Sequence, residues 1–223
     1  MRITKRQLRR IIQETIEGHA PLDSRAVIYC DMDGVLVDFE AGTIELLNRL
    51  LDEGNIGAGR VGKTFRKLQT ELGPEWRART RADLDIKPAR NFMFAVIAEN
   101  PGGFFSSLPP LLDGVNQLWP YINSTGHTVK LLTAGVPGQQ GMPTAEEGKT
   151  MWTMEELSPS PQEVILSPAR QKSEFAIAGG TANILIDDKT STINSWNDAG
   201  GIGILHSPGK SGRTIQKLQQ LGV

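Results

Sequence analysis

Acidic and hydroxyl side chains follow three short apolar runs of this sequence, at the points where the runs end. They are Asp31 and Asp33 after residues 26–30, Thr133 after residues 129–132, and Asp187 and Asp188 after residues 184–186. Short continuous apolar runs are typical of buried strands in a parallel sheet. Ligands bind such sheets beyond the carboxyl ends of the strands, so we expect these side chains to meet at one edge of a sheet.

Carboxylates gathered at one edge would repel one another unless a cation lay among them. An all-oxygen set of this kind suits Mg²⁺, which keeps several waters and leaves a position for a phosphate oxygen. Lys172, shortly before Asp187, supplies a second positive charge. The set therefore indicates phosphoryl transfer, in which charge builds up on the phosphoryl oxygens. Taken singly, each motif is also explained by a turn or a helix cap.

The elements that must position these residues alternate along the chain. Two further apolar runs, residues 164–166 and 202–205, complete a series of five. The helical stretches between and after them are residues 111–122, 144–157, 191–199 and 214–221. Strands alternating with helices predict an α/β fold, a Rossmann-like parallel sheet with helices on both faces.

The segment between the first two strands interrupts this alternation. It contains three helical stretches with Gly and Pro between them, at residues 45–52, 64–72 and 90–99. We therefore predict a helical cap over residues 41–105, inserted after the first strand. The core domain then comprises residues 23–40 and 106–223. For residues 1–22 we predict a separate arm, a basic amphipathic helix that docks on the body or frays in solvent; recruitment of a partner or nucleic acid is the alternative.

Composition limits the function classes. A formal net charge of −1 gives no general attraction for nucleic acid or an anionic membrane. The single cysteine, Cys30, cannot form an intramolecular disulfide and is expected in the core. No apolar run is long enough for a membrane span or signal peptide, so a cytoplasmic setting is the default expectation. His127 and His206 lack metal-ligand spacing, and we expect surface or turn roles for them.

The motifs resemble those of the haloacid dehalogenase (HAD) superfamily. The segment DMDGVLVDF at residues 31–39 is similar to its first motif, and Leu131 to Thr133, Lys172, and Ile184 to Asp188 are similar to the second, third and fourth. Within that superfamily, the first motif together with residues 101–110 most resembles the 5′(3′)-deoxyribonucleotidases.

The resemblance implies a role for each matched residue. Asp31 would be the nucleophile, and Asp33 the general acid and then the general base. Asp31, the main-chain carbonyl of Asp33, and Asp188 would hold Mg²⁺, with Asp187 orienting the site. Thr133 and Lys172 would bind the phosphoryl oxygens. Residues expected at the substrate are Phe39, Thr133, Ala134 and Lys172.

The chain also departs from the deoxyribonucleotidase pattern. Thr133 is followed by Ala134 and Gly135, where those enzymes typically have Ser-Pro, so one phosphate-binding hydroxyl is missing. Lys172 lies further from Asp187 than in that family, and Lys149 is a weaker rival for its role. Candidates for a base-stacking surface in the insertion are Phe65, Trp76, Phe92 and Phe94, although core packing also explains each of them.

A rival motif lies in the predicted cap. Residues 57–64, GAGRVGKT, satisfy the phosphate-loop pattern. That loop requires a buried strand directly before it, so that the helix N-terminus meets the phosphates. Residues 46–52 before it are helical in period instead. We therefore interpret the match as accidental.

The sequence thus predicts a Mg²⁺-dependent phosphomonoester hydrolase that acts through an aspartyl-phosphate. The expected substrate is a small phosphorylated molecule, a (deoxy)nucleoside monophosphate first. One alternative is a phosphatase for another small phosphometabolite or a nucleic-acid end, and a second is a non-catalytic binding protein with the same fold. Whether the chain forms a homodimer stays open.

Overall fold

The core is a single parallel sheet. The computed structural model describes residues 23–54, 56–135 and 143–223, so the predicted N-terminal helix lies outside the described residues. Five parallel strands pair in the order β3-β2-β1-β6-β7. They are β1 (Val27–Cys30), β2 (Thr128–Thr133), β3 (Val164–Leu166), β6 (Ile184–Asp187) and β7 (Ile202–Leu205). All five predicted strands are present, and the Rossmann-like α/β class is confirmed.

Register brings the ends of the central strands together. Cys30 of β1 is paired with Leu131 of β2 on one side and with Ile186 of β6 on the other. The Asp31 amide still donates to the Ile186 carbonyl at 2.8 Å. The residues that follow these three strands therefore emerge at one edge of the sheet.

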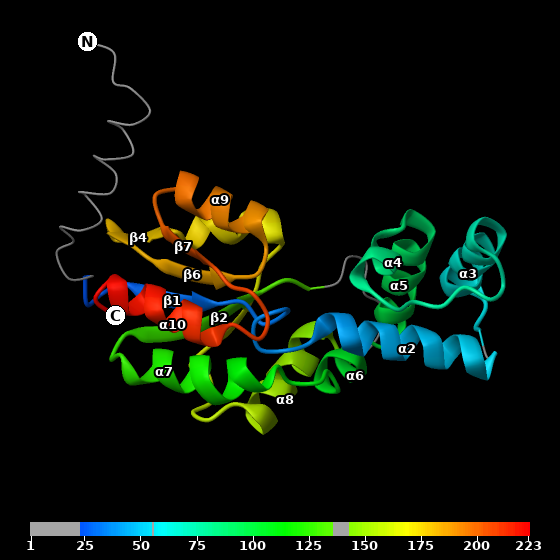
Figure 1. Cartoon of the computed structure of the whole chain (residues 1–223), viewed down its shortest axis with the longest axis horizontal. Coiled ribbons are helices and arrows are strands. Elements are labelled where there is room, and N and C mark those ends of the chain that lie inside the picture. Colours follow the sequence, from blue (N-terminus) through cyan, green and yellow to red (C-terminus); the bar gives the residue numbers. More distant parts are fainter. Residues whose placement is uncertain (1–22, 55, 136–142) are drawn as a thin grey trace, which may run out of the picture.

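Alternate strand residues face two different layers of helices (Figure 1). The helices are α7 (Trp119–Ser124), α8 (Ala145–Glu156), α9 (Thr190–Asp198) and α10 (Ser211–Gln220). Tyr29 and Leu185 pack with Trp196 of α9 in a small cluster on one face. Their sequence neighbours Ile28 and Ile186 join the larger cluster on the other face. Burial on both faces explains why these strands are continuous apolar runs.

Helices fill the segment between β1 and β2. They are α2 (Phe39–Glu53), α3 (Gly59–Leu72), α4 (Arg81–Asp85), α5 (Lys87–Glu99) and α6 (Pro101–Ser106). We use "cap" for α2 to α5, which extend away from the sheet in Figure 1, whereas α6 packs against α8. The predicted insertion is therefore present, but α4 and α6 were not predicted and α2 begins earlier than residue 45. The domain boundaries at residues 40 and 105 stay predictions.

Local capping accounts for the difference in the helix starts. The Asp38 carboxylate accepts the Ala41 amide and begins α2. Thr80 and Asp83 form a reciprocal capping box that begins α4, a helix too short to show periodicity. The predicted helix over residues 111–122 contains a π-helical turn, Gly114–Leu118.

Two candidate stacking aromatics instead form the interior of the cap. Phe65 and Phe92 pack with ring centroids 5.7 Å apart, and Phe92 is fully buried. Trp76 also packs against the core cluster. The core-packing explanation therefore holds for these three rings.

A short hairpin lies outside the five-stranded sheet. The strands β4 (Ile177–Ala178) and β5 (Thr181–Ala182) form a hairpin that was not predicted.

Cys30 is fully buried, as expected. The surface or turn role predicted for His206 is wrong, because its ring is buried and Nδ1 lies 2.9 Å from the Thr214 hydroxyl of α10. Among the described helices, none combines the length and apolar character needed to cross a membrane.

Candidate active site

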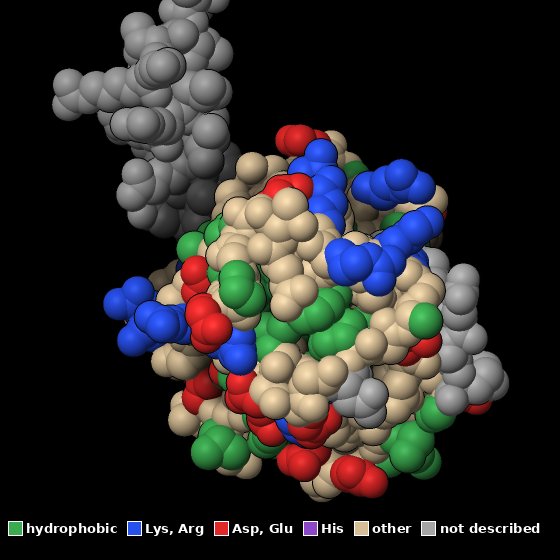
Figure 2. Space-filling model, turned by 90° about the vertical axis from the view of Figure 1, so that its right-hand side faces the viewer, with side chains coloured by type: hydrophobic (Ala, Val, Ile, Leu, Met, Phe, Trp, Pro, Cys, Tyr) green, Lys and Arg blue, Asp and Glu red, His purple; other side chains and the backbone are tan. Residues whose placement is uncertain are grey.

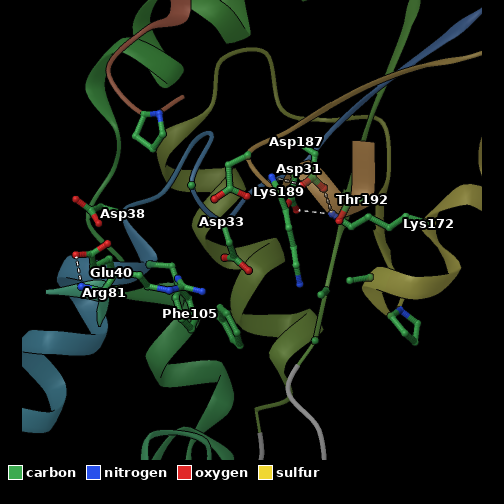
Figure 3. A pocket seen from close by; sticks show the side chains of 18 of the residues that line it. Asp31, Asp33, Asp38, Glu40, Arg81, Phe105, Lys172, Asp187, Lys189 and Thr192 are labelled. Atoms are coloured by element: carbon green, nitrogen blue, oxygen red, sulfur yellow. Dashed lines mark hydrogen bonds and ion pairs between the residues drawn. The ribbon is translucent and has the colours of Figure 1, made fainter. Parts of the chain in front are cut away.

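A cavity of about 1520 Å³ lies at the edge of the sheet where β1 and β6 end. Figure 3 shows acidic and basic side chains from the core and the cap around it. The charged residues that line it are Asp31, Asp33, Asp38, Glu40, Arg81, Arg170, Lys172, Asp187, Asp188 and Lys189. Ala134 and Gly135 line it after β2. The sequence therefore brings its predicted acidic residues into one cavity.

Three of the acids form a compact cluster. Asp31, Asp187 and Asp188 offer carboxylate oxygens that all lie within 4.8 Å of one another. Burial, together with the charges of Asp31 and Asp187, raises the pKa of Asp188 to about 6. Burial and the charge of Asp31 also raise the pKa of Asp187. Such mutual repulsion is what a divalent cation would relieve, so these oxygens fit Mg²⁺.

Gly34 allows this cluster to form. Its backbone has a φ of 78°, which L-residues other than glycine rarely adopt. A Cβ atom at this position would also collide with the Asp188 carboxylate. The Asp-Gly turn after β1 therefore lets the Asp188 side chain approach the first motif.

Lys172 lies beside the cluster, on a 3₁₀ helix, η2 (Ala169–Phe175). Its Nζ lies 3.0 Å from Asp31 Oδ1 and 2.8 Å from Asp187 Oδ2, and only 2% of the side chain is exposed. Burial alone would lower the pKa of Lys172, but the charges of Asp31 and Asp187 raise it overall. The two acids therefore favour the charged form of Lys172, which contacts the predicted nucleophile.

Lys149 on α8 forms a second cationic centre. It is fully buried, and its Nζ donates to Asp33 Oδ2 at 2.9 Å and to Thr133 Oγ1 at 2.6 Å. The same Nζ lies 4.4 Å from the centroid of the Phe105 ring, a cation–π distance. The two lysines therefore do not occupy the same position, because Lys149 pairs with Asp33 whereas Lys172 pairs with Asp31 and Asp187.

Asp33 lies apart from the three-acid cluster. Burial and the charge of Asp31 raise its pKa, while Lys149 opposes the shift. Lys149 holds Oδ2, whereas Oδ1 has no hydrogen-bond partner among the residues the structure describes. Its side chain is thus not a member of the group that fits a metal, and metal binding through the Asp33 main-chain carbonyl stays a prediction.

Of the residues expected at the substrate, Thr133 is buried, whereas Phe39 lines the cavity itself. The Thr133 side chain is fully buried and its hydroxyl accepts from Lys149, so its contact with phosphate stays a prediction. Phe39 lines the cavity and packs edge-on against Phe104, with centroids 5.6 Å apart. Phe94 and Phe105 also line the cavity, so an aromatic wall is present.

The cap contributes residues that sequence reasoning missed. Arg81, the first residue of α4, lines the cavity, and its backbone amide donates to Glu40 Oε1 at 2.8 Å (Figure 3). Glu40 is on α2, so this bond ties two cap helices together beside the acids. One exposed arginine among many carries no local sequence signal.

The phosphate-loop match lies elsewhere. Helix α2 ends at Glu53 with Gly54 as its C-cap, so a helix and not a strand comes before residues 57–64. None of these residues lines the cavity at the sheet edge. Gly57, Ala58 and Val61 instead border a separate hollow of about 540 Å³. Figure 2, which views the cap end of the molecule, shows a hollow lined by hydrophobic side chains.

Comparisons with known proteins find similarity in structure alone. No protein-family model matches the sequence, and no curated protein matches it. A structure named as a dehalogenase is 13% identical, covering 90% of this chain and 98% of that one, with a TM-score of 0.47. A hydrolase from Streptococcus pneumoniae TIGR4 is 16% identical, covering 87% and 100%, with a TM-score of 0.46.

A third solved structure is named as a haloacid dehalogenase-like family hydrolase from Streptococcus pneumoniae. It is 14% identical, covering 88% of this chain and 91% of that one, with a TM-score of 0.43. At these identities and TM-scores, the names of the neighbours assign no activity to this chain.

Proposed function

We propose that this chain is a Mg²⁺-dependent phosphomonoester hydrolase of the HAD superfamily, with Asp31 as its nucleophile. The observation that carries the proposal is the placement of Asp31 between a buried lysine and two further acids at the carboxyl edge of a parallel sheet. Asp33 follows two residues later with a free carboxylate oxygen. This arrangement supplies a nucleophile, a proton carrier and a metal-binding set.

The contacts of Asp31 distinguish its two oxygens. Oδ1 accepts the Met32 amide at 2.8 Å and pairs with Lys172. Oδ2 accepts no hydrogen bond from any residue that the structure describes. We therefore assign Oδ2 as the attacking atom, with Lys172 and the Met32 amide fixing the orientation of the carboxylate.

The reaction then proceeds in two displacements. Asp31 Oδ2 attacks phosphorus, the bond from phosphorus to the ester oxygen breaks, and protonated Asp33 gives its proton to the leaving alcohol. Asp33, now a carboxylate, takes a proton from a water that attacks the aspartyl-phosphate. The bond from phosphorus to Asp31 breaks and inorganic phosphate leaves. The raised pKa of Asp33 suits the first step, because it favours the protonated form.

A bound Mg²⁺ would be held by Asp31 and Asp188, with Asp187 beside them, and would neutralise charge on the phosphoryl oxygens. Asp187 accepts from Lys172 through Oδ2 and from the Lys189 amide through Oδ1, so its carboxylate is held in one orientation. It is therefore placed to orient the site.

A nucleoside monophosphate is our first substrate class. The aromatic side chains of Phe39, Phe94 and Phe105 line the same cavity as the acids, and aromatic rings stack on bases. The alternatives are another small phosphometabolite or a nucleic-acid end. A different kind of alternative is that the protein is a non-catalytic binding protein with the same fold.

Turnover of p-nitrophenyl phosphate with and without Mg²⁺ tests the proposal. We expect metal-dependent release of p-nitrophenol from the wild-type protein and none from the Asp31→Asn variant, whose fold is checked by circular dichroism. A folded wild-type protein without turnover would support the binding-protein alternative. A panel of deoxynucleoside monophosphates against sugar phosphates then separates the two substrate classes.

A further inference from the structure

Arg81 is a cap residue that faces the active-site cavity. Its backbone amide is tied to Glu40 of α2, so the start of α4 is fixed beside the cavity. Figure 3 shows its guanidinium in the cavity, on the side of Asp33 away from Lys172. The cavity is therefore bordered by a core cation, Lys172, against Asp31 and Asp187, and by a cap cation, Arg81, on the other side of Asp33.

The guanidinium of Arg81 is available to a ligand. Its ion pair is with Asp85, at 3.5 Å from Nε to Oδ2, and the two side chains are 60% and 57% exposed. Exposed pairs of this kind contribute little. Among the described residues, no hydrogen bond acceptor engages the guanidinium. Lys149 and Lys172, by contrast, are buried and each is paired with acids.

Two of the acids near Arg81 in Figure 3, Asp38 and Glu40, are already engaged, and Asp33 on the other side of the guanidinium is held by Lys149 through Oδ2. Asp38 Oδ1 accepts the Ala41 amide, and Glu40 Oε1 accepts the Arg81 amide. Both carboxylates therefore hold the backbone of the cap. Neither one forms an ion pair with the guanidinium.

We propose that Arg81 binds a second anionic group of the substrate, a phosphate or carboxylate remote from the phosphoryl group that reacts. The inference rests on the proposed function and narrows its substrate class. A guanidinium presents a planar pair of donors that matches either anion. The cavity, at about 1520 Å³, exceeds the roughly 300–1,000 Å³ of an ordinary small-molecule site, so it has room for both groups.

Two other cations line the cavity, but both belong to the core. The Lys189 amide binds Asp187 Oδ1 at 2.8 Å, which places this residue directly at the acid cluster. Arg170 is on η2, the segment that carries Lys172. Both of these cations are contributed by the core, whereas Arg81 is contributed by the cap.

Binding of phosphonates tests the inference without turnover, because a carbon–phosphorus bond is not broken by transfer to Asp31. The probes are ω-phosphonocarboxylates and alkylene bisphosphonates of increasing chain length, each matched with an alkylphosphonate that lacks the second anion. Dissociation constants are measured by calorimetry with Mg²⁺ present. We expect the wild-type protein to prefer the doubly anionic probe by about tenfold at one chain length, about 1.4 kcal/mol. The two probe series distinguish a carboxylate from a phosphate.

Matched variants assign the preference to one residue. Arg81→Gln keeps the backbone bond to Glu40 and should lose the preference. Arg79→Gln removes the same charge two residues away, at an exposed position that does not line the cavity, and should keep it. The inference is overturned by a wild-type protein that shows no preference, by an Arg81→Gln variant that retains it, or by its loss in Arg170→Gln instead. Failure of the proposed function would appear separately, as absent turnover of p-nitrophenyl phosphate.

Discussion

The edge of the core sheet and residues 57–64 of the cap both carry phosphate-binding sequence patterns, yet their surroundings differ. At the sheet edge, Asp31, Asp187 and Asp188 converge around one point with Lys172 against them. In the cap segment, Lys63 is exposed on α3, and the Thr64 hydroxyl donates to carbonyls of its own helix, those of Arg60 and Val61. The Arg66 guanidinium lies beside Gly62, but no cluster of acids forms at these glycines in the part of the chain that the structure describes.

The difference lies in the element that comes before each motif. A strand of a parallel sheet delivers its last residue to an edge shared with other strands, so residues far apart in sequence meet. A helix, α2, comes before the glycine segment and provides no such edge. A phosphate motif is therefore informative only together with the element that positions it.

The largest effect separates these two regions directly. Asp31→Asn removes the nucleophile and should lower kcat for p-nitrophenyl phosphate by roughly 10⁴-fold or more. Lys63→Ala changes an exposed residue and should alter kcat/KM by no more than about twofold. Steady-state kinetics of both variants provides the comparison. A loss caused by Lys63→Ala, with activity kept in Asp31→Asn, would reverse our assignment.

Stability should show the same contrast. Lys172→Met leaves Asp31 and Asp187 without their shared counter-charge and should lower the free energy of unfolding by about 3–5 kcal/mol in the absence of metal. The matched change Lys63→Met should cost less than about 0.5 kcal/mol. Urea denaturation measures both values. Equal losses in the two variants would mean that the buried ion pairs of Lys172 do not stabilise the folded protein more than an exposed lysine does.

Metal affinity should depend on pH in a defined window. Burial and the charges of Asp31 and Asp187 raise the pKa of Asp188 to about 6. A proton on this carboxyl competes with Mg²⁺, so the dissociation constant should rise about tenfold per pH unit below that pKa and level off above it. Calorimetry across this range measures it, with Asp188→Asn as the control that loses the dependence. A flat profile in the wild-type protein would remove Asp188 from the metal site.

The smallest effect concerns the same carboxyl without metal. Because the folded pKa of Asp188 is raised, the charged form destabilises the folded state above that pKa. Asp188→Asn should therefore stabilise the metal-free protein at neutral pH by about 1 kcal/mol, allowing for solvent screening of an exposed side chain. The gain should disappear as the pH falls toward the unfolded pKa of about 4. Thermal unfolding at two pH values detects it, and a loss of stability at neutral pH would contradict it.

Part of the fold was predictable because its signals are local and strong. The strands are short apolar runs buried on both faces, and the acids directly follow them, so the sheet and the cluster of Asp31, Asp187 and Asp188 could be expected from the sequence. Helix α4 could not, because a five-residue helix has no measurable period and depends on its capping box.

Two features of the site depend on tertiary contacts: the role of Lys149, which the sequence offered only as a rival of Lys172, and the presence of Arg81, which it did not predict. Lys149 lies on the buried face of α8 with Ala145 and Trp152, four residues before and three after it, a spacing that a careful helical projection would show. Its partners could not be read from that spacing, because Asp33 is 116 residues away in sequence and Thr133 is at the end of β2. Arg81 is one of several arginines in an exposed segment, and its direction is set by the packing of α4 beside α2.

The most direct test of the account is to locate the covalent phosphate. Asp33→Asn should slow hydrolysis of the intermediate, while p-nitrophenyl phosphate, with its good leaving group, still allows the enzyme to be phosphorylated. Acid quench followed by peptide mass spectrometry should then find phosphate on Asp31. Phosphate on another residue, or turnover by the wild-type protein with no phosphorylated Asp31 in the trapped variant, would contradict the proposed mechanism.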